Sequence, residues 1–171
     1  MVQMERHLVD SQIQTVAIAF VVVFLMLAAM IQSVRIACVA MLPNLLPVAV
    51  GLGLMPLLGI SLNPGSVMVA AVALGIVVDD TTHLLVATQR QLANTPDVAV
   101  AVQSAIAEVG PQIFVTSLVI IGSMVVLTFG SFAPGVHFGT ITMTVVFVAL
   151  LADLLILPRL LCVVHKRWRL F

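Results

Sequence analysis

The apolar residues of the chain fall into five long runs. Each run is close to the roughly 20 residues that an α-helix needs to cross a bilayer. The runs cover residues 13–31, 36–58, 66–88, 111–130 and 136–157. Short segments that are polar or contain glycine and proline separate them. We therefore predict an all-α polytopic membrane protein with five transmembrane helices, whose membrane domain takes up residues 13–163.

A sixth, shorter helix is predicted over residues 96–109, with Thr95 as its N-cap and Gly110 as its stop signal. Valine and isoleucine recur along one side of this segment, whereas Asp97 and Glu108 lie on the opposite side. An amphipathic helix of this kind is typical of the membrane interface.

The ends of the chain are polar and predict segments outside the bilayer. Residues 1–12 lack the basic region and the cleavage site of a signal peptide, and they are expected to form an extracytoplasmic stub. Residues 164–171 are expected to form a basic cytoplasmic tail. The first apolar run must then direct membrane insertion by itself.

The basic residues predict the orientation. With five spans, one side of the membrane receives Arg35, Arg90, Arg159, Lys166, Arg167 and Arg169. Arg6 falls on the other side. The positive-inside rule places the side rich in arginine and lysine in the cytoplasm. The pattern thus predicts a protein integral to the plasma membrane, the inner membrane in a bacterium, with its N-terminus outside and its C-terminus inside.

Composition agrees with a membrane protein and excludes other classes. Hydrophobic residues make up 62% of the chain and charged residues 8%, compared with about 25% charged residues in soluble domains. The formal net charge is zero, so the basic patch of a nucleic-acid-binding protein is missing. The two cysteines are far apart in the sequence and have no metal-ligand spacing, so neither a metal nor another cofactor is expected.

Asp79 and Asp80 are the residues most suggestive of chemistry. Each aspartate at the centre of a membrane helix costs about 2.5–3.5 kcal/mol. Asp79 lies roughly 20 Å along the helix predicted over residues 66–88, within a hydrocarbon core of roughly 30 Å. Two adjacent carboxylates in a low dielectric cannot easily both ionise. The pair, with His83 one turn further on, therefore predicts a proton relay.

The same helix places Ala71, Gly75, Asp79 and His83 on one stripe, at intervals of four residues. Small residues on such a stripe allow a second helix to approach closely. We therefore expect this face to pack against another helix.

A purely structural interpretation remains open at this stage. Thr82, Thr116 and Ser117 could supply hydrogen bonds to a polar cluster that only fixes helix packing, although such hydroxyls more often bond to their own backbone. Asp153 allows two interpretations of equal weight: a functional acid, or a group near the membrane surface that snorkels or pairs with Arg159.

Several motifs in this order resemble the resistance-nodulation-division (RND) superfamily. They are Pro43–Pro47, Gly75–His83, Gly110, Thr116–Leu118, Phe132–Pro134, Phe138–Gly139 and Ala152–Pro158. Within the superfamily the pattern is most similar to the hydrophobe/amphiphile exporter and MMPL-like group, which is related to the Patched and sterol-sensing proteins.

The resemblance implies the transmembrane part of an exporter of hydrophobic or lipid-like molecules, driven by the proton gradient and not an enzyme. Asp79 and Asp80 match the family's proton-relay position, His83 a residue often found one turn on, and Asp153 a recurrent acid. Members have two similar halves with large extracytoplasmic domains, so the chain resembles the last five helices of one half. The expected partners are membrane lipids, a lipid-like substrate, the missing half or extracytoplasmic domain and a possible second copy of the chain.

Other functions remain possible. A lipid- or sterol-binding module without transport suits the helix count and the prolines of residues 36–58, but does not require titratable groups in mid-membrane. An intramembrane aspartyl protease needs two acids on facing helices, whereas Asp79 and Asp80 point about 100° apart on one helix. A degenerate fragment without function is the remaining alternative.

Overall fold

The computed structural model describes the backbone of residues 2–59 and 64–168, and the side chains of residues 14–59, 72 and 74–164. The helices are α1 (Val2–Ile31), α2 (Val34–Leu57), α3 (Pro64–Leu92), α4 (Val98–Thr128), α5 (Ala133–Leu151), the π-helical turn η1 (Ala152–Ile156) and α6 (Leu157–Trp168). The described residues contain no strand, which confirms the predicted all-α class.

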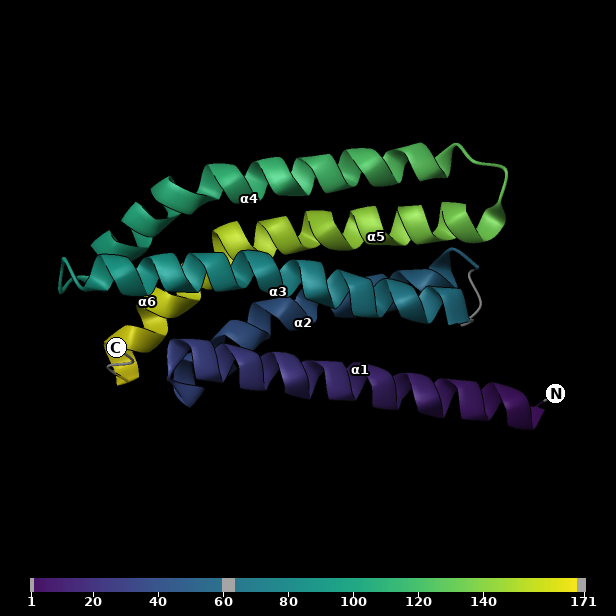
Figure 1. The fold of residues 1–171 in the computed structure, drawn as a ribbon, viewed down its shortest axis with the longest axis horizontal. Helices are drawn as coiled ribbons and strands as arrows, with labels where there is room; N and C mark the ends of the chain where they lie inside the picture. The colour runs from purple at the N-terminus through teal and green to yellow at the C-terminus, as the bar shows by residue number, and fades with distance from the viewer. Residues whose placement is uncertain (1, 60–63, 169–171) are drawn as a thin grey trace.

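The long helices lie side by side in one bundle (Figure 1). Within the described residues, four segments are long and apolar enough to cross a membrane: Gln14–Ile31, Val34–Leu57, Val98–Thr128 and Ala133–Val164. The fifth long helix, α3, carries the two adjacent acids and packs against α1, α2, α4 and α5. The predicted class of a polytopic membrane protein is therefore confirmed.

The first helix is longer than the sequence pattern predicted. It begins at Val2 and not near residue 13, so the predicted polar stub continues the first span as helix. No glycine or proline interrupts residues 2–31, and polar residues alone do not end a helix. Gln32, with a φ of 53°, makes the turn into α2, and the Ser33 hydroxyl accepts a hydrogen bond from the N–H of Ile36.

The predicted amphipathic segment 96–109 is continuous with the span that follows it. Asp97, and not Thr95, is the N-cap, because its carboxylate accepts a hydrogen bond of 2.9 Å from the N–H of Ala99. The helix then runs through Gly110 and Pro111 and bends (Figure 1). Proline removes one hydrogen bond and kinks a helix, but both arms of α4 pack on the bundle, so the helix does not end there.

The last predicted span also continues past its proline. The helix was predicted to end near residue 157, whereas α5, η1 and α6 form an unbroken helical path through Pro158 to Trp168. In the π turn the N–H of Leu157 donates to the carbonyl of Ala152. Such single-turn π-bulges occur inside α-helices, frequently at functional sites. Most of the predicted basic tail is therefore helical.

Close backbone approach joins α4 and α5. A Cβ atom added to Gly139 would lie 2.8 Å from the carbonyl oxygen of Met124 and 3.1 Å from the Cβ of Leu127. Small residues at such contacts are the usual means of packing membrane helices. Large apolar side chains cover the outside of the bundle, among them Phe114, Val126 and Phe147, as expected of a surface that faces lipid.

Candidate functional site

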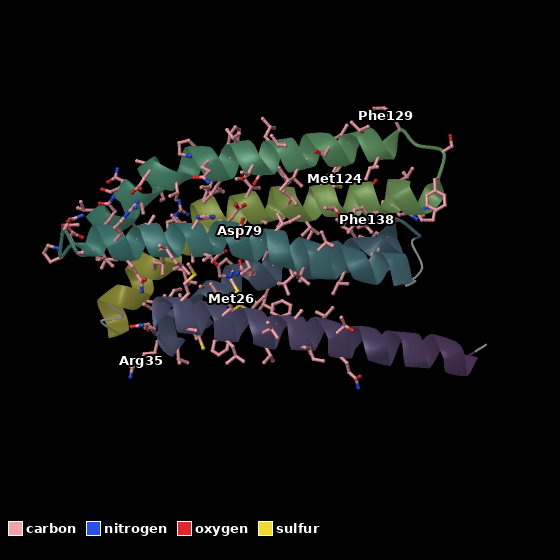
Figure 2. All side chains as sticks on the ribbon, in the orientation of Figure 1. Met26, Arg35, Asp79, Met124, Phe129 and Phe138 are labelled. Atoms are coloured by element: carbon pink, nitrogen blue, oxygen red, sulfur yellow. The ribbon has the colours of Figure 1, made fainter. Side chains whose placement is uncertain are left out.

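The polar residues of α3 divide between two sides of that helix. Asp80 and Thr81 face the interior, where Asp80 is 8% exposed and Thr81 is fully buried. The side chains of Asp79 and His83 are 75% and 54% exposed. Figure 2 shows Asp79 between the two ends of the bundle. The predicted relay residues thus share one level of α3 but lie on different faces.

Thr81 is the centre of a buried network that joins three elements. Its hydroxyl oxygen lies 2.7 Å from Oδ1 of Asn44 on α2 and 2.7 Å from Oδ1 of Asp153 on η1. The carbonyl of Val77 on α3 is 3.2 Å away. Asn44, Thr81 and Asp153 are each 0% exposed. The network therefore ties the proline-containing helix α2 and the π turn to the centre of α3.

Asp80 connects α3 to α4. The Ser117 hydroxyl donates to Oδ2 of Asp80 at 3.4 Å. Thr116 instead bonds to the carbonyls of Gln112 and Ile113 in its own helix. Thr82 likewise bonds to the carbonyl of Val78, at 2.7 Å. Of the three hydroxyl residues considered as supporting groups, Ser117 is the one that hydrogen-bonds to an acid among the described side chains.

The stripe of Gly75, Asp79 and His83 faces outward. Nothing lies within 4 Å of a Cβ atom added to Gly75, so the expected close approach of a second helix at this residue is wrong within this bundle. The side chain of Ala71 lies outside the described residues. Nε2 of His83 is 3.6 Å from Oδ1 of Asp79, which pairs these two groups one helical turn apart.

A pocket between α3 and α4 brings the acids together with polar groups of α4. It has a volume of about 110 Å³ and is lined by Asp79, Asp80 and His83, with Gln112 and Thr116 opposite. One water molecule needs roughly 10–15 Å³ of such space, so the pocket has room for several. Pockets for drug-sized ligands have volumes of roughly 300–1,000 Å³. The pocket therefore suits water and protons and is too small for a sterol.

Asp153 lies deeper than the sequence indicated. Of the two interpretations of Asp153, the one that has it snorkel near the membrane surface or pair with Arg159 is not what the structure shows. Asp153 is fully buried and contacts Thr81, whereas Arg159 is exposed. The π turn contains one more residue than an α-helical turn, and Asp153 lies within that turn.

Asn44 and Thr81 were missed as site residues by sequence reasoning. Asn44 was covered only by the Pro43–Pro47 motif, and Thr81 only by the motif around the acids. The available signal was an amide in the middle of an apolar run, since a buried amide must find a partner. Among the described side chains, no group of three or more His, Cys, Asp or Glu residues could hold a metal ion.

Long apolar helices around buried acids and hydroxyls define a domain of a polytopic α-helical membrane protein. The family model described as Patched SSD, a sterol-sensing domain, matches residues 11–163. Because this match covers most of the chain, the chain belongs to the Patched SSD family. Such domains occur in transporters related to the RND and MMPL proteins, so the predicted relationship to this wider group is confirmed at that level. A search of curated proteins found no match.

Proposed function

We propose that the chain is the proton-coupled transmembrane part of an RND-type transporter for hydrophobic or lipid-like molecules. The observation that supports this most is Asp80, a buried acid that also lines a pocket with room for water. Ionisable groups inside a membrane are costly and mark ion or proton pathways. A structural role in helix packing alone needs no titratable group.

In the proposed mechanism, Asp79 and His83 receive a proton at the exposed side of the pocket and Asp80 holds it inside. Ser117 donates a hydrogen bond to Asp80. This bond is stronger when Asp80 is ionised than when its carboxyl is protonated and neutral. The strength of the contact between α3 and α4 then depends on the proton. A proton crossing 100 mV supplies about 2.3 kcal/mol, enough to shift a balance between two packings of α4.

In this proposal the chain lies in the plasma membrane, with the N-terminus outside and the C-terminus in the cytoplasm. Its partners are membrane lipids, a lipid-like substrate and a second half or extracytoplasmic domain of the transporter. It catalyses no covalent reaction.

The transporter is purified through a tag on this chain, together with any chains that co-purify, and is placed in lipid vesicles. The test measures proton flux across the membrane of these vesicles. We expect Asp80→Asn and Asp79→Asn to lower substrate-dependent proton flux by about 100-fold or more, the scale of a lost proton-transfer group. The control is Asp97→Asn, because asparagine is as good an N-cap as aspartate. Full flux in Asp80→Asn would contradict the proton-relay role.

Sterol or lipid binding without transport is the second candidate, and membership in the Patched SSD family favours it. The pocket is too small for a sterol, so the ligand would lie on the lipid-facing surface of the bundle. A photoreactive sterol distinguishes the two functions. Two results together would support sensing in place of transport. The photoreactive sterol would label the protein saturably and equally in Asp80→Asn, and the vesicles would show no proton flux.

A further inference from the structure

The Thr81 network contains too few hydrogen atoms for its acceptors. A threonine hydroxyl has one hydrogen to donate, yet Asn44 Oδ1, Asp153 Oδ1 and the Val77 carbonyl all lie within hydrogen-bond distance of it. Turning the Asn44 amide, whose O and N are interchangeable by assignment, would bring Nδ2 to Thr81 as a donor and leave Oδ1, in place of Nδ2, without a partner. With the amide as the structure has it, a proton on Asp153 supplies the missing hydrogen, because Asp153 then donates to Thr81 and Thr81 donates to Asn44.

Asp153 is poorly placed to be ionised. A carboxylate can accept about four hydrogen bonds, but its Oδ2 has no partner among the described residues and Oδ1 has Thr81 alone. The Nδ2 of Asn44 is also buried without a partner there. The ion pairs found in the described part of the chain join Asp79 with His83 and Arg90 with Glu108. Neither provides a cation to Asp153.

The helices packed against η1 also leave Asp153 without a counter-charge. Their described titratable or charged side chains are Arg35 and Cys38 on α2, Asp79, Asp80, His83 and Arg90 on α3, His137 on α5, and Arg159 and Cys162 on α6. The three arginines are exposed. Asp79 and Asp80, when ionised, carry a charge of the same sign as an ionised Asp153.

We propose that Asp153 is a second proton-binding carboxyl, separate from the pocket acids and joined to α3 through the buried hydroxyl of Thr81. The inference rests on the proposed function, because it gives the same proton pathway an inner site. A protonated Asp153 donates to Thr81, which leaves the hydrogen of Thr81 for Asn44, so that η1, α3 and α2 are joined in one chain of hydrogen bonds. Release of that proton places a like charge near Asp80, so the two acids favour ionising alternately.

The test is infrared spectroscopy of the chain in lipid bilayers across a pH series. We expect a protonated carboxyl band at neutral pH that resists hydrogen–deuterium exchange and disappears in Asp153→Asn. Thr81→Val should shift the frequency of this band, because the carboxyl loses a hydrogen bond. The matched control is Thr82→Val, which removes only a bond within α3 and should leave the band in place.

Two results would overturn the inference: a neutral-pH spectrum without such a band, or a band that persists in Asp153→Asn. If Asp153→Asn does not fold, as judged by circular dichroism, the band shift in Thr81→Val decides, and its absence counts against Asp153. The proposed function has a separate test. If Asp80→Asn keeps its full proton flux while the Asp153 band is present, the proposed function is wrong although the inference about Asp153 stands.

Discussion

At the scale of single residues, two neighbouring threonines differ in role. Thr82 satisfies its hydroxyl within its own helix, as such residues usually do, whereas Thr81 contacts side chains on two other elements. Their side chains point about 100° apart on the helix. That rotation alone decides which of the two becomes part of a network between helices.

The contact between Asn44 and Thr81 predicts a measurable coupling. We expect Asn44→Leu and Thr81→Val each to lower the free energy of unfolding, and the double variant to cost less than the sum of the two. The coupling should be about 0.6 kcal/mol and at most about 1.7 kcal/mol, the average and the maximum found for hydrogen bonds between membrane helices. Unfolding in mixed detergent micelles measures it by a double-mutant cycle. Strict additivity would show that the two side chains do not interact.

Sequence reasoning found the acids but not their directions. Helical periodicity correctly puts Gly75, Asp79 and His83 on one face and Asp80 on another. It cannot say which face is internal when apolar residues surround the helix, because the usual contrast between a polar and an apolar side is missing. Asp79 was therefore expected against another helix and is found exposed. Ser117 was considered as a hydrogen-bond donor to the polar cluster, and the structure places it against Asp80.

At the scale of elements, the apolar runs located the helices well but misjudged where they end. Pro111 and Pro158 were taken near helix boundaries, yet both lie inside helical paths. A proline removes one backbone donor and bends the helix. Neighbouring helices that pack on both arms maintain the path, and such packing is a tertiary property that a local pattern does not contain.

The packing of α4 on α5 gives a prediction for one glycine. We expect Gly139→Ala to destabilise the bundle by about 1–3 kcal/mol, the usual cost of overpacking, because its Cβ would meet a backbone oxygen that cannot rotate away. The control is Gly122→Ala on α4, where nothing lies within 4 Å of the new atom. Thermal unfolding of both variants in detergent provides the comparison. Equal stability of the two variants would contradict the close approach.

At the scale of the whole molecule, the bundle has two different ends. Arg35 lies at the end where α1 passes into α2, and the turn between α3 and α4 lies at the same end (Figures 1 and 2). Arg90 pairs there with Glu108, which also accepts a hydrogen bond from Gln91. The start of α1 and the turn between α4 and α5 lie at the opposite end (Figure 1). This arrangement agrees with the distribution of basic residues on which the proposed orientation rests.

Cysteine labelling tests that orientation at the two ends. In a background with Cys38→Ser and Cys162→Ser, we expect Ser131→Cys to react with an impermeant thiol reagent added outside intact cells. Asn94→Cys should react only after the membrane is made permeable. Both positions are exposed, so they differ in the side of the membrane and not in burial. The reverse labelling pattern would invert the proposed topology.

The π turn beside Asp153 also affects how this chain should be aligned with its relatives. One extra residue in a helix rotates everything after it by about 100°. A relative with a regular helix here would align with a one-residue gap inside a continuous span. Without the gap, Leu157 and Leu161, both fully buried, would each be matched to the position of the residue that follows it. A one-codon insertion is thus a simple route by which an ancestral helix could have acquired this turn.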